Sequence, residues 1–223
     1  MTQIAVVFHS GYGHTQRVAE HVAKGAQAVL LPIDDDGDLQ AAQWAALDAA
    51  PAIIFGSPTY MGSVSWQFKK FADDCSKRWV SGQWHNKLAA GFTISSNPSG
   101  DKLSTLQYMV TLAMQLGMVW VGQTQPNDGR LNRLGAYLGA MAQVPSTSPA
   151  GDIPEGDLAT AEALGQRVAG LVQGGSKGLT PTLKSAACLF ICAYIATFRW
   201  WTVPRVSTPW CKRPRPMVSR LWR

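Results

Sequence analysis

Apolar runs alternate with amphipathic segments along most of the chain. The apolar runs cover residues 4–8, 26–33, 51–56, 88–94 and 118–121. Short runs that are apolar at consecutive positions are typical of strands buried on both faces, as in a parallel sheet. Helical spacing predicts helices after residue 15, over 39–47, from 64, over 103–116 and over 157–172. The pattern therefore predicts an α/β fold.

Strands that alternate with helices predict one parallel sheet, joined by right-handed crossovers and covered by helices on both faces. We expect a five-stranded sheet of order 2-1-3-4-5, which places strands one, three and four side by side. Ligands of such sheets bind beyond the carboxyl ends of the strands. Because polar loops follow strands one, three and four, we expect these loops to form one site.

The loop after the first strand has the composition of an anion site. It consists of Ser10, Gly11, Tyr12, Gly13, His14 and Thr15, and it leads into a helix. Backbone N–H groups at a helix N-terminus bind phosphate, and glycines let the phosphate approach closely. The hydroxyl groups of Ser10 and Thr15 can donate two further hydrogen bonds. We therefore interpret this segment as a phosphate-binding loop.

Two other phosphate motifs fit this loop less well. A Walker A loop needs a lysine, and no lysine precedes Lys24. The dinucleotide pattern G-x-G-x-x-G begins at Gly11 and Gly13, but Gln16 replaces its third glycine. Asp34 lies at the distance expected for an acid that binds ribose. A dinucleotide site without flavin, and a turn without any ligand, stay open as alternatives.

The loops after the third and fourth strands suit a planar ring. The third strand leads into Pro58, Thr59, Tyr60, Met61 and Gly62, and the fourth into Ser95, Ser96, Asn97 and Gly100. Tyr60 and Met61 can cover a flat apolar ring. The serines and Asn97 can satisfy the polar edge of a heterocycle. A phosphate at one end and such a ring at the other indicate flavin mononucleotide (FMN).

Four motifs together resemble a known family. They lie at residues 9–15, 56–62, 71–82 (with Trp79) and 87–90. They resemble the flavodoxin-like NAD(P)H:quinone oxidoreductases and NADPH-dependent FMN reductases, some of which were once called tryptophan-repressor-binding proteins. The resemblance extends from residue 3 to residue 173. It implies a flavodoxin-like three-layer sandwich that binds FMN noncovalently and commonly forms a homodimer or homotetramer.

The resemblance also implies an activity and assigns roles to residues. Hydride from NADH or NADPH would pass through FMN to a quinone, a flavin or a similar small-molecule acceptor. Residues 10–15 would hold the phosphate, Thr59, Tyr60 and Met61 would border the isoalloxazine ring, and residues 95–100 would meet its polar edge. Tyr12 and Trp79 match positions that face the nicotinamide or the quinone, so both are predicted to bind substrate.

The sequence departs from the family in two places. Residues 95–100 replace a run of glycines, and residues 114–117 replace a pair of histidines that some members carry. No histidine of the helix over 103–116 is therefore expected to serve the flavin. No nucleophile is paired with a base, so we predict no catalytic side chain. A flavodoxin-like one-electron carrier is the alternative function.

Three further segments carry expectations about structure. Asp101 is expected to cap the helix over 103–116. The segment 122–156, rich in Gly, Pro and Ser, is predicted to be a long loop that can build an oligomer interface and a substrate pocket. The acidic cluster 34–38 is interpreted as a solvated turn, and no metal site is predicted.

Charge divides the chain into two parts. Residues 1–175 hold 11 basic and 14 acidic residues, a net charge of −3, whereas residues 176–223 hold 9 basic residues and no acidic residue. The sequence pI of about 9.3 therefore reflects the second part, and nucleic-acid binding is not predicted. The four cysteines form no CxxC pair. With no leader pattern at the N-terminus, we expect a cytoplasmic protein.

These differences suggest two regions. Residues 1–175 are predicted to be the FMN-binding domain, and 176–223 a basic, Trp/Pro-rich extension that is disordered or loosely docked. The apolar segment 185–198 is shorter than the roughly 20 residues needed to cross a bilayer. An interfacial membrane anchor is the less favoured alternative for this extension.

Overall fold

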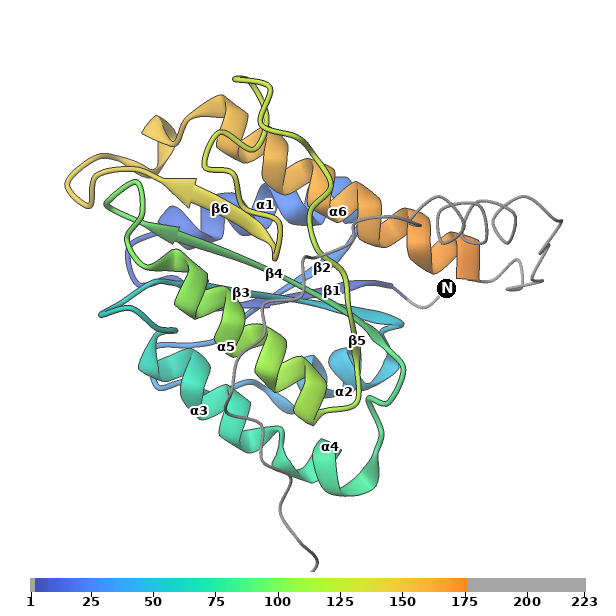
Figure 1. Ribbon diagram of the computed structural model, residues 1–223. Coiled ribbons are helices and arrows are strands. Elements are labelled where there is room, and N and C mark those ends of the chain that lie inside the picture. The colour runs from blue at the N-terminus through green and yellow to red at the C-terminus, as the bar shows by residue number, and fades with distance from the viewer. Residues whose placement is uncertain (1–2, 176–223) are drawn as a thin grey trace, which may run out of the picture. The chain divides into compact units, whose positions relative to one another are not determined.

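The computed structural model describes residues 3–175. One parallel sheet of order β2-β1-β3-β4-β5 forms its centre, and a sixth strand, β6, also pairs with β4. The strands are β1 (Ala5–Phe8), β2 (Val29–Pro32), β3 (Ala52–Pro58), β4 (Leu88–Ser95), β5 (Val119–Trp120) and β6 (Ala140–Gln143). Figure 1 shows β4 and β6 ending at the same edge of the sheet. The predicted fold class and strand order are confirmed.

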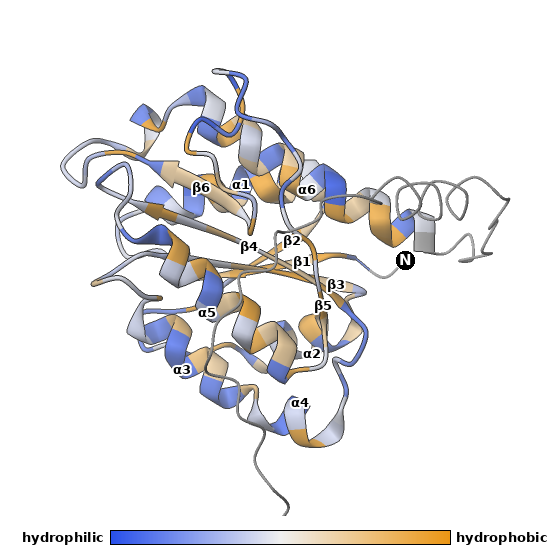
Figure 2. Ribbon diagram, viewed as in Figure 1, coloured by the Kyte–Doolittle hydropathy of each residue, from blue (hydrophilic) through white to orange (hydrophobic). Residues whose placement is uncertain are grey.

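Helices cover both faces of the sheet. The helices α1 (His14–Ala26) and α6 (Glu155–Gly175) lie on one face. The other face carries α2 (Ala41–Ala49), α3 (Trp66–Asp74), α4 (Ser76–Ser81) and α5 (Lys102–Gln115). Alternate residues of β1 face the two sides, so each side has its own hydrophobic core. Figure 2 shows apolar strands between helices whose outer sides are more hydrophilic.

The strand β6 is absent from the sequence-based expectation, which made 122–156 one long loop. In the structure β5 pairs with the start of β4, at Leu88 and Ala89, and β6 pairs with its end, from Phe92 to Ser95. The two short strands thus share one edge of β4. Only four residues long, β6 alternates between buried and half-buried positions. Such a run is too short and too mildly apolar to predict from periodicity.

Several helix boundaries also differ from expectation. α3 begins at Trp66, because the Ser65 hydroxyl accepts a hydrogen bond from the backbone N–H of Phe68 (3.3 Å). Asp101 does stand at the N-cap position of α5, but its side chain makes no capping hydrogen bond. Its left-handed backbone (φ 52°) is not the extended conformation that a side-chain cap requires. The predicted side-chain cap at Asp101 is therefore wrong.

No helix within residues 3–175 is long and apolar enough to cross a membrane. The predicted extension 176–223, including the apolar segment 185–198, lies outside the described residues.

Candidate functional site

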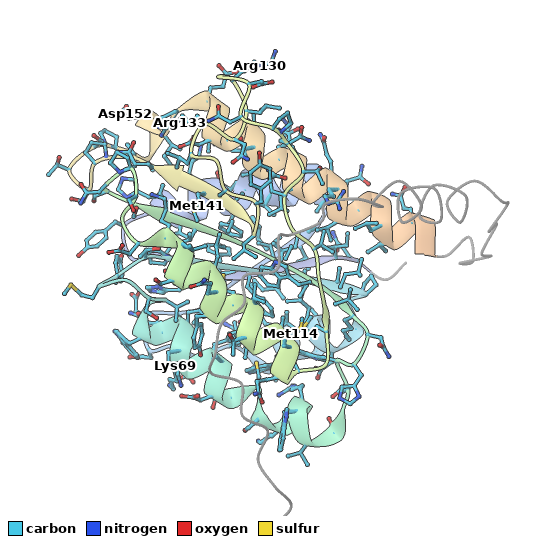
Figure 3. The ribbon with its side chains drawn as sticks, viewed as in Figure 1. Lys69, Met114, Arg130, Arg133, Met141 and Asp152 are labelled. Atoms are coloured by element: carbon cyan, nitrogen blue, oxygen red, sulfur yellow. The ribbon has the colours of Figure 1, made fainter. Side chains whose placement is uncertain are left out.

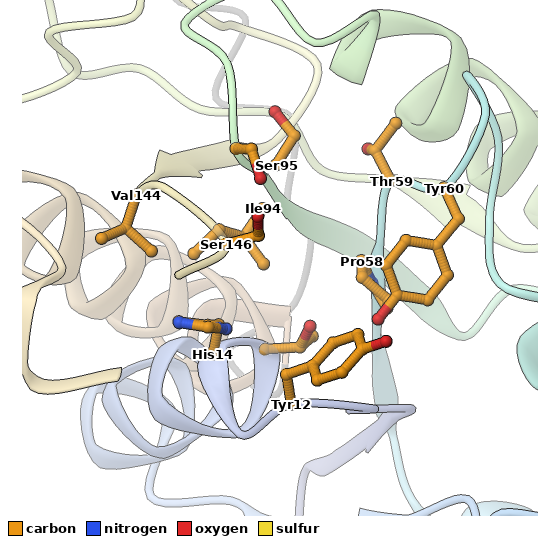
Figure 4. A pocket seen from close by; sticks show the side chains of 11 residues that line it. Tyr12, His14, Pro58, Thr59, Tyr60, Ile94, Ser95, Val144 and Ser146 are labelled. Carbon is orange, nitrogen blue, oxygen red and sulfur yellow. The ribbon is translucent and has the colours of Figure 1, made fainter. Parts of the chain in front are cut away.

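Three loops meet in one cavity at the carboxyl edge of the sheet. They follow β1, β3 and β4, as the strand order predicts, and a fourth loop, after β6, closes one side (Figure 4). The lining residues are Tyr12, His14, Thr15, Pro58, Thr59, Tyr60, Ile94, Ser95, Ser96, Val144 and Ser146. A site that draws on three adjacent strand ends is the usual ligand position of a doubly wound sheet.

The loop after β1 leads into the N-terminus of α1. Gly13 caps that helix in the left-handed region (φ 83°), which costs other residues conformational energy. The backbone N–H groups of His14 and Thr15 stand in the first turn, where no intrahelical acceptor is available. The Ser10 hydroxyl accepts a hydrogen bond from the N–H of Gln16 (3.1 Å). The loop therefore presents free donors and a helix dipole to an anion.

His14 connects this first loop to the loop after β6. Its Nε2 donates a hydrogen bond to the carbonyl oxygen of Ser148 (2.7 Å). The imidazole is thus fixed at the side of the cavity that Val144 and Ser146 line. Its role here is to join two loops, an arrangement that the sequence does not reveal because Ser148 lies 134 positions away.

Two tyrosines form the outer wall of the cavity. The Tyr12 ring is 77% exposed and meets the Tyr60 ring edge-to-face, with 6.5 Å between centroids. The Tyr60 hydroxyl packs against Gly11, where a Cβ would lie only 2.9 Å from the hydroxyl oxygen. Burial, followed by the nearby Tyr12, raises the pKa of Tyr60. An exposed, rigid aromatic pair of this kind can stack on a planar ring.

The loop after β3 is anchored beneath the cavity by hydroxyl groups. Thr59 Oγ1 lies 2.8 Å from Oγ1 of Thr93 and 2.8 Å from Oγ1 of Thr105. These contacts join the loop to β4 and α5. The Thr59 hydroxyl is therefore occupied by hydrogen bonds within the protein. The groups of this loop that can contact a ligand are its backbone, Pro58 and Tyr60.

A buried lysine holds the loop after β4. Lys102 is fully buried, and its ammonium donates hydrogen bonds to Ser95 Oγ (2.8 Å) and to the carbonyl oxygens of Asn97 (2.9 Å) and Pro98 (2.9 Å). Burial lowers the pKa of Lys102 to about 8; Asp157 opposes this shift and Arg133 adds to it.

Lys102 is not among the site residues predicted from the sequence. The sequence feature that could have identified it is its place at the first position of the helix α5, where the helix dipole disfavours a cation.

The same loop is held from the side by residues of the segment 122–156, together with Asp157 of α6. Gln143 Nε2 donates a hydrogen bond to the Ser96 carbonyl oxygen (2.7 Å). Asp157 accepts from the backbone N–H of Gln143 (2.9 Å) and binds Arg133 through both carboxylate oxygens (2.7 Å each). Arg133 is labelled in Figure 3. The segment 122–156 is thus mostly the loop expected from composition, but β6 interrupts it and this network joins it to the loop after β4.

The predicted residues of these loops divide into two groups. The cavity brings together Tyr12, His14, Thr15, Pro58, Thr59, Tyr60, Ser95 and Ser96. In the same loops, but outside the cavity lining, are Ser10, Gly11, Gly13, Met61, Gly62, Asn97 and Gly100. The lining residues Ile94, Val144 and Ser146 were not predicted; the last two follow β6, which the sequence analysis did not recognise as a strand.

Trp79 is not placed in this cavity. It lies in α4, is 56% exposed, and lines a separate groove with Tyr108, Leu112 and Leu116. Within one chain the structure therefore does not bring Trp79 together with Tyr12. Its predicted contact with substrate stays a prediction.

Asp34 is engaged in a local turn. Its Oδ1 accepts hydrogen bonds from the backbone N–H groups of Asp36 (3.1 Å) and Asp38 (2.7 Å). This agrees with the turn expected for the acidic cluster. Among residues 3–175, no group of three His, Cys, Asp or Glu side chains is arranged to hold a metal ion.

Comparison with known proteins agrees with this geometry. Residues 9–130 match the sequence profile of the NADPH-dependent FMN reductases. The chain belongs to this family. The match ends before β6, Gln143 and Asp157. The residues that hold the loop after β4 from the side therefore lie outside the matched span.

Individual relatives cover most of the chain. Flavodoxin FldP of Pseudomonas aeruginosa is 48% identical over 180 residues, which are 78% of this chain and 98% of the relative. An NAD(P)H dehydrogenase (quinone) of Archaeoglobus fulgidus is 33% identical over 193 residues, covering 76% and 96%. The crystal structure of a WrbA-like flavodoxin from Agrobacterium tumefaciens has a TM-score of 0.67 at 50% identity, covering 78% and 99%. The predicted family resemblance is thus confirmed.

Proposed function

We propose that the protein is an FMN-dependent oxidoreductase that transfers hydride from NADH or NADPH to a quinone, a flavin or a similar acceptor. We also propose that it works in the cytoplasm. The observation that carries the proposal is the cavity itself, where a phosphate-type loop, an aromatic wall and a polar loop face one space. Bound FMN would supply the hydride chemistry, while the chain supplies binding and orientation.

The residues fit the chemistry of the cofactor. The free N–H groups at the start of α1, with Thr15, suit the phosphate. Tyr12 and Tyr60 suit the flat faces of the ring. Ser95 and Ser96 suit its polar edge. Tyr12, being exposed, is also free to meet the nicotinamide or acceptor ring.

The test uses the purified full chain loaded with FMN under anaerobic conditions. Its visible spectrum is recorded before and after one equivalent of NADH or NADPH. Bleaching of the flavin bands within seconds, reversed by a quinone, is the expected result. A protein that takes up no FMN would contradict the cofactor assignment.

A second function is favoured by one observation. The 48% identical relative carries the name flavodoxin, which supports a carrier that passes single electrons to a protein partner. The same experiment separates the two functions. A stable flavin spectrum that neither nucleotide bleaches, but that dithionite does, would favour the carrier over the hydride-transfer enzyme.

We further propose that the chain forms a homodimer or homotetramer. Support comes from large exposed hydrophobic side chains on neighbouring helices, namely Trp66 on α3, Trp79 and Val80 on α4, and Met114 on α5. Sedimentation equilibrium of the full chain tests this, and a monomer at micromolar concentration would contradict it.

A further inference from the structure

Lys102 differs from the other groups that surround the cavity. An ammonium has three donor hydrogens, and Lys102 directs its three hydrogen bonds to one loop, at Ser95, Asn97 and Pro98. It does not line the cavity. A direct contact with a ligand is therefore not its role, and its effect must pass through the loop.

The charge of Lys102 has no carboxylate directly bonded to it. Its acceptors are one hydroxyl and two carbonyl oxygens, while the nearby charges of Asp157 and Arg133 act in opposite directions. Burying a cation without an ion-pair partner is costly. Methionine could fill the same space without this cost, but it would leave these three oxygens without their donor, so the lysine acts through its contacts with the loop.

The ammonium lies one hydrogen bond from the cavity wall. Ser95 lines the cavity and accepts from Lys102 at 2.8 Å. We assigned this loop to the polar edge of the flavin ring. Two-electron reduction leaves the flavin ring negatively charged at neutral pH, and a nearby cation in a poorly solvated position stabilises such a charge.

We propose that Lys102 is a positioning residue of the flavin site: it holds residues 95–98 against the cavity and places a positive charge behind them, which increases the affinity for reduced FMN relative to oxidised FMN. The inference rests on the proposed binding of FMN. It deepens that proposal, because a site that stabilises the reduced cofactor accepts hydride from NAD(P)H more readily.

The first part of the test needs no cofactor. Backbone ¹⁵N order parameters of Ser96, Asn97 and Ser99 are measured in the full chain, in Lys102→Met and in Lys102→Gln. Methionine removes charge and hydrogen bonds, whereas glutamine removes charge and keeps an N–H donor. We expect order parameters of about 0.85 in the parent chain and below about 0.6 in Lys102→Met, with Lys102→Gln between them. A failure of FMN binding would leave this measurement intact.

The second part measures the ratio of the dissociation constants of oxidised and reduced FMN, from anaerobic redox titration of the loaded protein. We expect both Lys102 variants to lower the ratio about tenfold, equivalent to about 30 mV for a two-electron couple. The control, Lys77→Met, removes the same charge from an exposed position in α4 and should leave the ratio unchanged. A purely structural role would not change the ratio in Lys102→Gln.

Two results would overturn the proposal. One is loop order parameters in Lys102→Met equal to those of the parent chain. The other is an affinity ratio in Lys102→Gln equal to that of Lys77→Met. If Lys102→Met does not fold, Lys102→Gln, which keeps a polar donor, supplies both measurements.

Discussion

The loops at residues 10–15 and 95–100 line the same cavity but are held in different ways. The first is shaped by the left-handed glycine Gly13 and by the hydrogen bond from Gln16 to Ser10, and it has one distant contact, from His14 to Ser148. The second depends on the buried charge of Lys102 and on Gln143, which lies 47 positions from Ser96. Both loops therefore have a distant contact, but only the second is also held by a buried charge.

The largest effect is expected at the first loop, residues 10–15. Gly13→Val should reduce FMN affinity at least about 100-fold, because a β-branched residue does not tolerate the left-handed backbone and the loop must change shape. A Cβ at Gly13 would meet no atom within 4 Å, so strain rather than collision is the cause. Fluorescence titration with FMN measures the loss.

Gly129 provides a matched control for this substitution. It has the same φ of 83° and the same open surroundings, but it lies outside the cavity lining. Gly129→Val should lower stability by a similar amount and leave FMN affinity within about twofold, since strain in the left-handed region costs ~1–2 kcal/mol at either place. Equal losses of affinity in the two variants would contradict the phosphate-loop assignment.

The next largest effect is expected from a substitution in the network that holds the loop at residues 95–100. Asp157→Asn should lower the free energy of unfolding by about 2 kcal/mol, because it leaves Arg133 without its partner at a carboxylate that is only 1% exposed. The backbone at Ser96 should also become less ordered, because Asp157 positions Gln143, which donates a hydrogen bond to the Ser96 carbonyl oxygen. Urea denaturation measures the stability change. Asp38→Asn, which breaks an exposed pair with Lys70, should lower the free energy of unfolding much less, because solvent screens an exposed pair. Equal losses in the two variants would show that the buried network adds nothing.

The buried charge of Lys102 should make the free energy of unfolding depend on pH. Its pKa falls from 10.5 to about 8 on folding, so the unfolded chain binds more protons between these two pH values. Stability therefore rises with pH across this window, by at most about 1.4 kcal/mol per unit. The difference in unfolding free energy between the parent chain and Lys102→Met, measured from pH 7 to 10.5, isolates this contribution. A difference independent of pH would contradict the lowered pKa.

The smallest effect is expected at Ser10. Ser10→Ala removes the acceptor for Gln16 N–H and should cost about 1 kcal/mol of stability, together with a severalfold loss of FMN affinity. Ser65→Ala removes the corresponding hydrogen bond at the start of α3, which contributes no cavity residue. It should lower the melting temperature without changing FMN affinity. A Ser10→Ala protein with unchanged affinity would remove Ser10 from the phosphate loop.

The comparison of the two loops also explains what the sequence could predict. The apolar runs and the strand order were sufficient to bring the three loops to one cavity, because parallel strands align their carboxyl ends. The strand β6 was not predictable, since Ala140–Gln143 has little hydrophobic pattern and acquires its structure from β4. The supports at Gln143, Arg133 and Asp157 were missed for the same reason: their contacts exist only after the chain has folded.

The shared edge of β4 has a consequence for the order in which the molecule is completed during synthesis. A growing chain that ends before residue 140 already contains all three loops and the β4 strand, but the outer edge of β4 from Phe92 to Ser95 has no partner. The cofactor-binding surface is therefore expected to be complete only after residues 140–157 have left the ribosome, because these residues supply β6, two lining residues of the cavity and Asp157.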